Sequence, residues 1–421
     1  MRRLILPFLI SATLSAQAVF DTYFVPGTLR IDYAQSGGAY NVKFNVLQIT
    51  KEPFWGGPRH NLTDDFNFGN YRVVVFDSLS QKEIFSRGFS SLFAEWQFTE
   101  EAQTKEERFL GTIIMPMPQR TVKIVFYHRD AYNNWEALKH FFVNPASDVK
   151  PNHHPHIYET AKIAYHGHPA NKLDIAFIAE GYTEDELIKF VEDCHKLADI
   201  LFDTEPFKRN KENINIWAVK AVSKESGVSN PAANITVNTV LKASFNTFNI
   251  ERYLMLTDHY TLRDIASNVP YDHIYVVVNT DDFGGGGIYN FFSIGTTHHP
   301  LAGYLLSHEF GHTLGGLADE YVSEDTVFAQ IYDKMIEPWE ANITTLVDFE
   351  KKWYHKVDKD TPIPTPEHVE GDVIGAFEGA GYNAQGIYRP MKNCMMRSAK
   401  DHTFCTICDS ILEAKILYFV R

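Results

Sequence analysis

The stretch Leu305–Tyr321 has the sequence LLSHEFGHTLGGLADEY, in which an apolar helical segment carries two histidines and ends at a double glycine followed by two acids. A spacing of four residues places His308 and His312 on one face of a helix, so both imidazoles can reach one metal ion. Apolar residues over 301–306 predict that this helix packs against a sheet. The pair Gly315–Gly316 predicts where the helix ends, because glycine adopts positive φ without strain.

Glu309 stands beside the first of these histidines and is placed to accept a proton from a water molecule near the metal. Zinc is the metal that we expect, because it lowers the pKa of water toward neutrality and polarises a peptide carbonyl. The motif therefore predicts hydrolysis of a peptide bond with Glu309 as the general base. The alternative is a merely structural helix that carries the same pentad, and the flanking residues argue against it.

The third metal ligand is expected after the glycine turn. Asp319 follows Gly316 by three residues, and a carboxylate is a legitimate zinc ligand that leaves a fourth position open for water. Glu320 competes for this role, whereas Ala318 cannot bind metal. Because neighbouring residues of an extended segment point to opposite sides, we expect Asp319 to face the metal and Glu320 to face away.

The helix motif with a following glycine and a third ligand resembles the metzincin arrangement, with one departure. The tenth residue after His308 is Ala318, and counting from the second glycine of the pair restores the spacing. Three segments are similar to the bacterial IgA-peptidase family of zinc metallopeptidases: DIAFIAEGYTEDEL (174–187), HEFGHTLGGLADEY (308–321), and GIYRPMKNCMMR with FCTIC (386–408). The resemblance extends over 162–421 and reaches the N-terminal part only through its architecture.

This resemblance implies a zinc endopeptidase in which an N-terminal β-domain precedes a metzincin-like catalytic domain. His308, His312 and Asp319 would hold one zinc ion, with Glu309 as the base. Metzincins also carry a methionine turn beneath the metal, and Met396 is the methionine that fits this position, with ordinary core packing as the alternative. Immunoglobulin is not implied as the substrate.

Three of the four cysteines gather near the C-terminus, at Cys394, Cys405 and Cys408. This number is too small for a disulfide scaffold, but one bridge from Cys394 to either of the others is chemically allowed after export. The alternative is a second, structural zinc site made by the same three cysteines and His402.

The pattern of apolar residues predicts an α+β or α/β protein built in two parts. Runs of alternating apolar and polar residues over 19–150 predict an antiparallel β-sandwich. A polar, proline-containing stretch with His153 and His154 follows, and it indicates a linker and a boundary near Lys150, although the two histidines are alternative metal ligands. Strand–helix–strand order over 151–421 then predicts a catalytic domain with a mainly parallel sheet and an active-site helix.

The N-terminus and the overall charge restrict the compartment and the partners. Residues 1–18 contain two arginines, an apolar run and a small-x-small end, which is the build of a cleaved secretory signal. We therefore expect a secreted, periplasmic or cell-surface protein.

With 39 Lys and Arg against 53 Asp and Glu, the net charge is −14. An acidic surface repels phosphate backbones and anionic lipid, which argues against nucleic acid partners and membrane insertion.

A protein or peptide is the expected substrate. The glycine run 284–287 predicts a sheet edge on which an extended peptide can pair, with a flexible connector as the alternative. Asp281 and Asp282 before it are candidate calcium ligands, although acidic turn residues commonly face water. Tyr382, Tyr388 and Arg389 are candidates for stabilising the oxyanion, but their spacing does not exclude simple packing.

Two rival functions stay open at this point. One is a zinc amidase that acts on peptide links of a cell wall, and the other is a non-catalytic, zinc-stabilised binding protein. Glu309 argues against the binding protein, because such a protein needs no base beside its metal.

Overall fold

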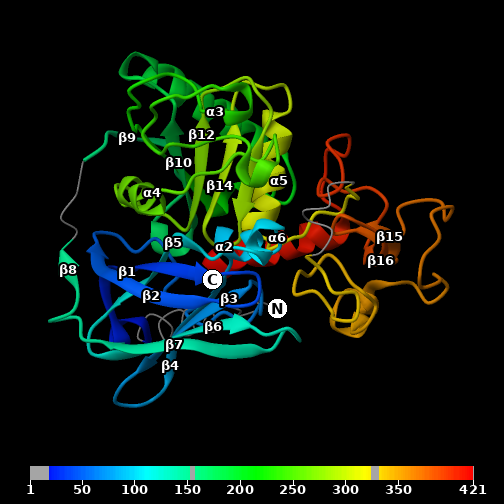
Figure 1. Ribbon diagram of the computed structural model, residues 1–421, viewed down its shortest axis with the longest axis horizontal. Coiled ribbons are helices and arrows are strands. Elements are labelled where there is room, and N and C mark those ends of the chain that lie inside the picture. The colour runs from blue at the N-terminus through cyan, green and yellow to red at the C-terminus, as the bar shows by residue number, and fades with distance from the viewer. Residues whose placement is uncertain (1–18, 152–156, 324–330, 421) are drawn as a thin grey trace, which may run out of the picture.

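The computed structural model describes residues 19–151, 157–323 and 331–420 (Figure 1). The signal-like segment 1–18 and the histidine pair His153 and His154 lie outside the described residues. None of the helices in the described ranges combines the length and the apolar composition needed to cross a membrane.

The N-terminal part consists of two four-stranded sheets that pack on each other. One sheet has the order β5 (Glu107–Pro118), β1 (Phe24–Gly37), β2 (Lys43–Glu52) and β8 (Lys150–Pro151), and the other has the order β4 (Glu83–Phe89), β3 (Tyr71–Asp77), β6 (Val122–Arg129) and β7 (Trp135–Val143). All pairs are antiparallel except the short β2–β8 pair. Between the sheets, the ring centroids of Phe44 and Phe126 are 4.2 Å apart. The alternating pattern of the sequence therefore predicted the antiparallel strands of this part correctly.

A six-stranded sheet forms the centre of the second part. Its order is β13 (Gly285–Ile288), β14 (Phe292–Thr296), β12 (His273–Val278), β10 (Leu173–Glu180), β11 (Ile214–Val219) and β9 (Thr160–Ala164). The four inner strands are parallel, and β13 and β9 are antiparallel edges. This agrees with the mainly parallel sheet that the sequence predicts.

Helices and one hairpin complete the fold. They are α2 (Leu92–Trp96), α3 (Leu187–Asp203), α4 (His259–Ala266), α5 (Ala302–Thr313), α6 (Thr406–Val420), and the strands β15 (Phe377–Ala380) and β16 (Asn383–Arg389). A capping box precedes α3, because the backbone N–H of Thr183 donates to the Glu186 carboxylate at 2.9 Å.

Strand β10 is buried along its whole length, and its central residues 175–179 are all apolar. Ile175 and Phe177 face a core that contains residues of α3, α5 and α6, whereas Ala176 and Ile178 face a core shared with the N-terminal sheets. A strand covered on both faces lacks the polar alternation of a half-exposed strand. In Figure 1 the N-terminal strands lie below the six-stranded sheet, and α6, in red, crosses the middle of the view.

The two parts are also joined by buried polar contacts. Arg30 on β1 is 2% exposed and lies 2.6 Å from both Asp32 and Asp264, the latter on α4, and 3.6 Å from Glu52. Nearby, Nδ1 of His259 on α4 lies 2.6 Å from the carbonyl oxygen of Leu110 on β5. The N-terminal sheets and α4 therefore share both an apolar core and an ion-pair network.

Replacing Arg30 by methionine tests this network. Arg30→Met keeps the length of the side chain but leaves Asp32 and Glu52 buried without their cation, so we expect a loss of about 3–5 kcal/mol in the free energy of unfolding. Urea denaturation measures this loss. Arg72→Met is the matched control, because Arg72 pairs with Glu83 where both side chains are partly exposed, and its loss should stay within about 1 kcal/mol. Equal losses in the two variants would contradict the assignment.

Candidate metal centre

Helix α5 carries the two histidines and ends in the way that its sequence predicts. Gly316 has φ +61°, and its N–H donates to the carbonyl of His312 at 3.0 Å. The N–H of Leu317 donates to the carbonyl of Gly311, also at 3.0 Å. This pattern closes the helix with a left-handed residue and reverses the chain toward the histidines. Gly316, the second glycine of the pair, makes the turn.

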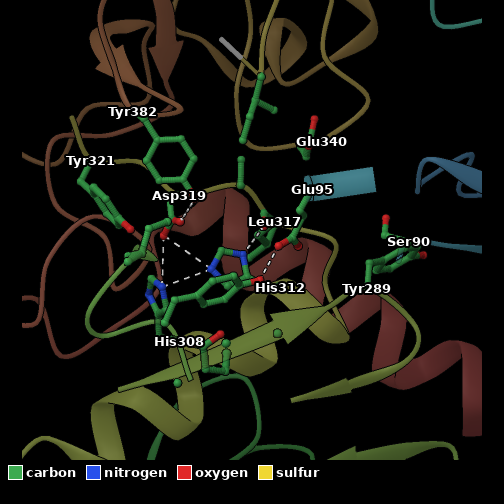
Figure 2. Close-up of a pocket in the computed structure, with 18 of the residues that line it drawn as sticks. Ser90, Glu95, Tyr289, His308, His312, Leu317, Asp319, Tyr321, Glu340 and Tyr382 are labelled. Carbon is green, nitrogen blue, oxygen red and sulfur yellow. Dashed lines mark hydrogen bonds and ion pairs between the residues drawn. The ribbon is translucent and has the colours of Figure 1, made fainter. Parts of the chain in front are cut away.

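The reversal brings Asp319 onto the two imidazoles (Figure 2). The Nε2 atoms of His308 and His312 are 3.2 Å apart, and Oδ1 of Asp319 lies 3.1 Å and 3.5 Å from them. Ligand atoms that surround a tetrahedral zinc ion at its usual bond lengths are separated by about 3.3 Å. The three atoms therefore have the spacing of one face of a zinc coordination tetrahedron, and all three residues line the same pocket.

Backbone carbonyls fix the orientation of both rings. Nδ1 of His308 lies 3.1 Å from the carbonyl oxygen of Met395, and Nδ1 of His312 lies 2.7 Å from that of Leu317. Since a carbonyl oxygen only accepts hydrogen bonds, each Nδ1 is the donor, and each Nε2 is left to bind a metal. The sequence motif does not reveal these two contacts.

Asp319 is held by residues from distant parts of the chain. The hydroxyl of Tyr382 donates to its Oδ2 at 2.5 Å. The side-chain amide of Asn342 accepts a hydrogen bond from the N–H of Ala318 and donates one to its carbonyl. Burial opposes ionisation of Asp319, but the facing histidines outweigh it and hold its pKa well below the usual range. In the same way, burial lowers the pKa of His312, and Asp319 more than compensates and raises it to about 10. The electrostatic potential beside the Asp319 carboxylate therefore strongly attracts positive charge.

Glu320, the competing ligand, points away from the histidines. Its side chain lies with three cysteines on the other side of the chain segment. This is the alternation that an extended segment predicts for adjacent residues.

Glu309 is buried at the wall of the same pocket. Burial raises the pKa of its carboxyl, and His312 and His308 oppose this rise. A Cβ atom placed on Gly287 would lie 3.0 Å from Oε2 of Glu309, so the carboxylate faces strand β13. Both residues line the pocket.

Met396 lies against the helix that carries the histidines. A Cβ atom on Gly311 would lie only 2.4 Å from the sulfur of Met396, so the thioether packs directly on the backbone between His308 and His312. The carbonyl of Met396 also accepts the N–H of Glu320 at 2.8 Å.

The N-terminal part supplies one wall of the pocket, which sequence reasoning missed. Glu95 on α2 points into it near His312, and the hydroxyl of Tyr253 donates to its carboxylate (Figure 2). Burial raises the pKa of Glu95 to about 7. No pattern around Glu95 marks it as a site residue, because only the packing of the two parts brings it there.

Of the remaining candidates, only Tyr382 lines the pocket. Tyr388 and Arg389 do not line the pocket, and Tyr382 serves Asp319. Asp281 and Asp282 are exposed, and neither belongs to a cluster of three or more metal-ligand side chains in the described ranges. His402 is exposed and is not part of the cysteine cluster.

Two family models match this chain. The model described as IgA Peptidase M64 matches residues 161–370 and 367–416, more than half of the chain, and the model described as Peptidase M64 N-terminus matches residues 19–139. The first match includes His308, Glu309, His312, Asp319 and Met396. A search of curated proteins finds no match.

Replacement of Asp319 tests its role as the third ligand. We expect Asp319→Ala to lower zinc affinity by more than the ~10–100-fold loss typical of a residue that only orients a ligand. Tyr382→Phe is the matched variant, since it removes the hydroxyl that donates to Oδ2 and keeps the ligand, and its loss should stay within ~10–100-fold. Competition with a chromophoric chelator measures both. Undiminished zinc binding by Asp319→Ala would transfer the role to another group.

Proposed function

The chain belongs to the IgA Peptidase M64 family, a family of peptidases, and from this premise we propose that it is an exported zinc endopeptidase acting on protein or peptide substrates. The observation that carries the proposal is the triangle of His308 Nε2, His312 Nε2 and Asp319 Oδ1, with edges of 3.1–3.5 Å. We assign 1–18 to a signal peptide, 19–150 to the N-terminal β-domain and 151–421 to the catalytic domain.

The donor set suits zinc. Two neutral imidazoles and one carboxylate form a common catalytic ligand set that leaves a position for water or substrate. A zinc ion held there would lower the pKa of water and polarise the substrate carbonyl. The thioether of Met396 packs on the backbone of α5 between the two histidines and so holds this part of the helix in place.

Glu309 is the group that moves the proton. Its carboxylate accepts a proton from the attacking water and delivers it to the leaving amine, so one residue serves both steps. Burial raises the pKa of Glu309, which makes its carboxylate a stronger base than an exposed glutamate.

Strand β13 is the surface that would hold an extended peptide. In an antiparallel edge strand, alternate residues direct their backbone groups outward. The N–H of Gly285 donates outward to the carbonyl of Arg252, and the carbonyl of Gly285 accepts the N–H of Leu254. Gly287 has the same orientation two residues later, beside Glu309 and at the pocket. Its N–H and C=O are therefore placed to pair with a substrate backbone next to the bond that is cleaved.

The rival functions are distinguished by the products. A cell-wall amidase would leave unfolded proteins intact and release peptides from peptidoglycan, and a binding protein would do neither. We favour the endopeptidase because a sheet edge recognises any extended peptide backbone, without requiring a glycan.

Chelation and one substitution test this proposal together. We expect a zinc chelator to abolish cleavage of unfolded casein and added zinc to restore it. Glu309→Gln should keep its zinc but lower kcat at least ~10²-fold, because glutamine cannot accept the proton. Glu95→Gln is the matched comparison, since it removes another carboxylate that lines the pocket. A larger loss in Glu95→Gln would transfer the role of base to Glu95, and full activity of chelated enzyme would refute the metal-dependent mechanism.

Gly287→Ala tests the proposed substrate strand. The new methyl group would meet Cγ2 of Thr313 at 2.9 Å and Oε2 of Glu309 at 3.0 Å, so both the strand and the base must shift. We expect kcat/KM to fall ~10-fold or more while zinc content is unchanged. Gly303→Ala is the control, because it overpacks α5 against Ile200 instead. Equal losses of kcat/KM in both variants would assign the effect to general overpacking.

A further inference from the structure

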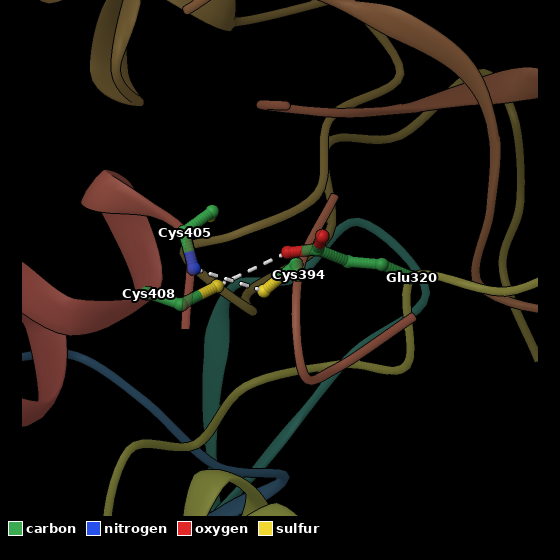
Figure 3. A group of neighbouring side chains, drawn as sticks. All are labelled: Glu320, Cys394, Cys405 and Cys408. Carbon is green, nitrogen blue, oxygen red and sulfur yellow. Dashed lines mark hydrogen bonds between the residues drawn. The ribbon is translucent and has the colours of Figure 1, made fainter. Parts of the chain in front are cut away.

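A second cluster of candidate metal ligands includes Glu320, the residue that directly follows Asp319 (Figure 3). Glu320, Cys394, Cys405 and Cys408 each offer one ligand atom, and these four atoms all lie within 4.8 Å of one another. All four side chains are buried, and the cysteines are free thiols. Sγ of Cys408 lies 3.0 Å from Oε1 of Glu320, and the N–H of Cys405 donates to Sγ of Cys394 at 3.3 Å.

We propose that these four residues form a second, structural zinc site that fixes the third ligand of the first. Three thiolates and one carboxylate are a suitable set for zinc, and their combined charge equals that of a four-cysteine site. Sulfur atoms around a tetrahedral zinc ion lie about 3.8 Å apart, so only a small contraction is needed.

The burial and the incomplete hydrogen bonding of the Glu320 carboxylate favour a cation at this position. The residue is 0% exposed, and its Oε2 has no hydrogen-bond partner, while Oε1 contacts Cys408 and the amide of Asn342. A buried carboxylate oxygen without a partner is costly. A divalent cation among the thiols removes this cost, because it coordinates the carboxylate directly.

The position of the cysteines on α6 favours thiolates. Cys405 directly precedes this helix and Cys408 lies in its first turn. The partial positive charge of a helix N-terminus stabilises a thiolate, which is the form that binds metal.

A disulfide explains the arrangement of these four groups less completely than a zinc ion does. A bridge between Cys394 and either of the others would use two of the four groups. It would leave one buried thiol beside Glu320 and would not satisfy the carboxylate. Zinc satisfies all four groups at once, and it crosslinks the segment of Glu320, the segment of Cys394 and the N-terminal end of α6.

The second site is coupled to the first through the chain. Glu320 follows Asp319 directly, and Cys394 precedes Met395, whose carbonyl oxygen orients His308. The N–H of Glu320 also donates to the carbonyl of Met396. A zinc ion bound by Glu320 and Cys394 therefore holds the two segments that position Asp319 and His308.

Metal content tests the proposal on the full chain. Elemental analysis of protein purified with zinc should give two zinc ions per chain. Cys408→Ser and Glu320→Gln should each lower this number to one. Cys194→Ser is the matched control, because Cys194 is equally buried on α3 but lies outside the cluster, and it should retain both ions.

Cobalt provides a readout that does not depend on the folding of any variant. The wild-type chain loaded with cobalt should show ultraviolet thiolate-to-cobalt charge-transfer absorption, which the histidine and aspartate ligands of the first site cannot produce. After denaturation without a reductant, all four cysteines should react with an alkylating agent. One zinc ion per chain, a cobalt spectrum without the thiolate band, or two protected cysteines would each overturn the proposal, the last by showing a disulfide.

Discussion

The left-handed turn at Gly316 is the constraint on which the candidate site depends. Its positive φ ends α5 and returns the chain over the face that carries His308 and His312. Leu317 then accepts the hydrogen bond that orients His312, and Asp319 reaches both Nε2 atoms. One more residue of helix before the turn would rotate these groups by about 100° and separate them.

The segment after this turn carries two adjacent acids that serve different clusters. Because successive side chains of an extended segment alternate, Asp319 faces the histidines and Glu320 faces the cysteines. Asn342 stabilises the segment 318–320, because its side-chain amide binds the backbone of Ala318 and the carboxylate of Glu320. Two buried carboxylates side by side would be unfavourable without compensating cations, which is a physical reason to place a metal on each side.

The N-terminal sheets belong to the site as well as to the scaffold. They share an apolar core with β10 and α4, and α2 brings Glu95 into the pocket. The contact between Glu95 and Tyr253 joins the two parts at the wall of the pocket. The shape of the pocket on this side therefore depends on how the two parts pack.

The sequence by itself determined the features that depend on neighbours along the chain. The helical register of His308, Glu309 and His312, the stop at the glycine pair and the strand types of both parts all follow from local periodicity and backbone preference. Only the tertiary structure decided that Tyr382 supports Asp319, that Glu95 reaches the pocket, and that Glu320 rather than His402 joins the cysteines. These contacts connect residues far apart in the sequence, and they depend on the packing of separate elements, which local patterns do not encode.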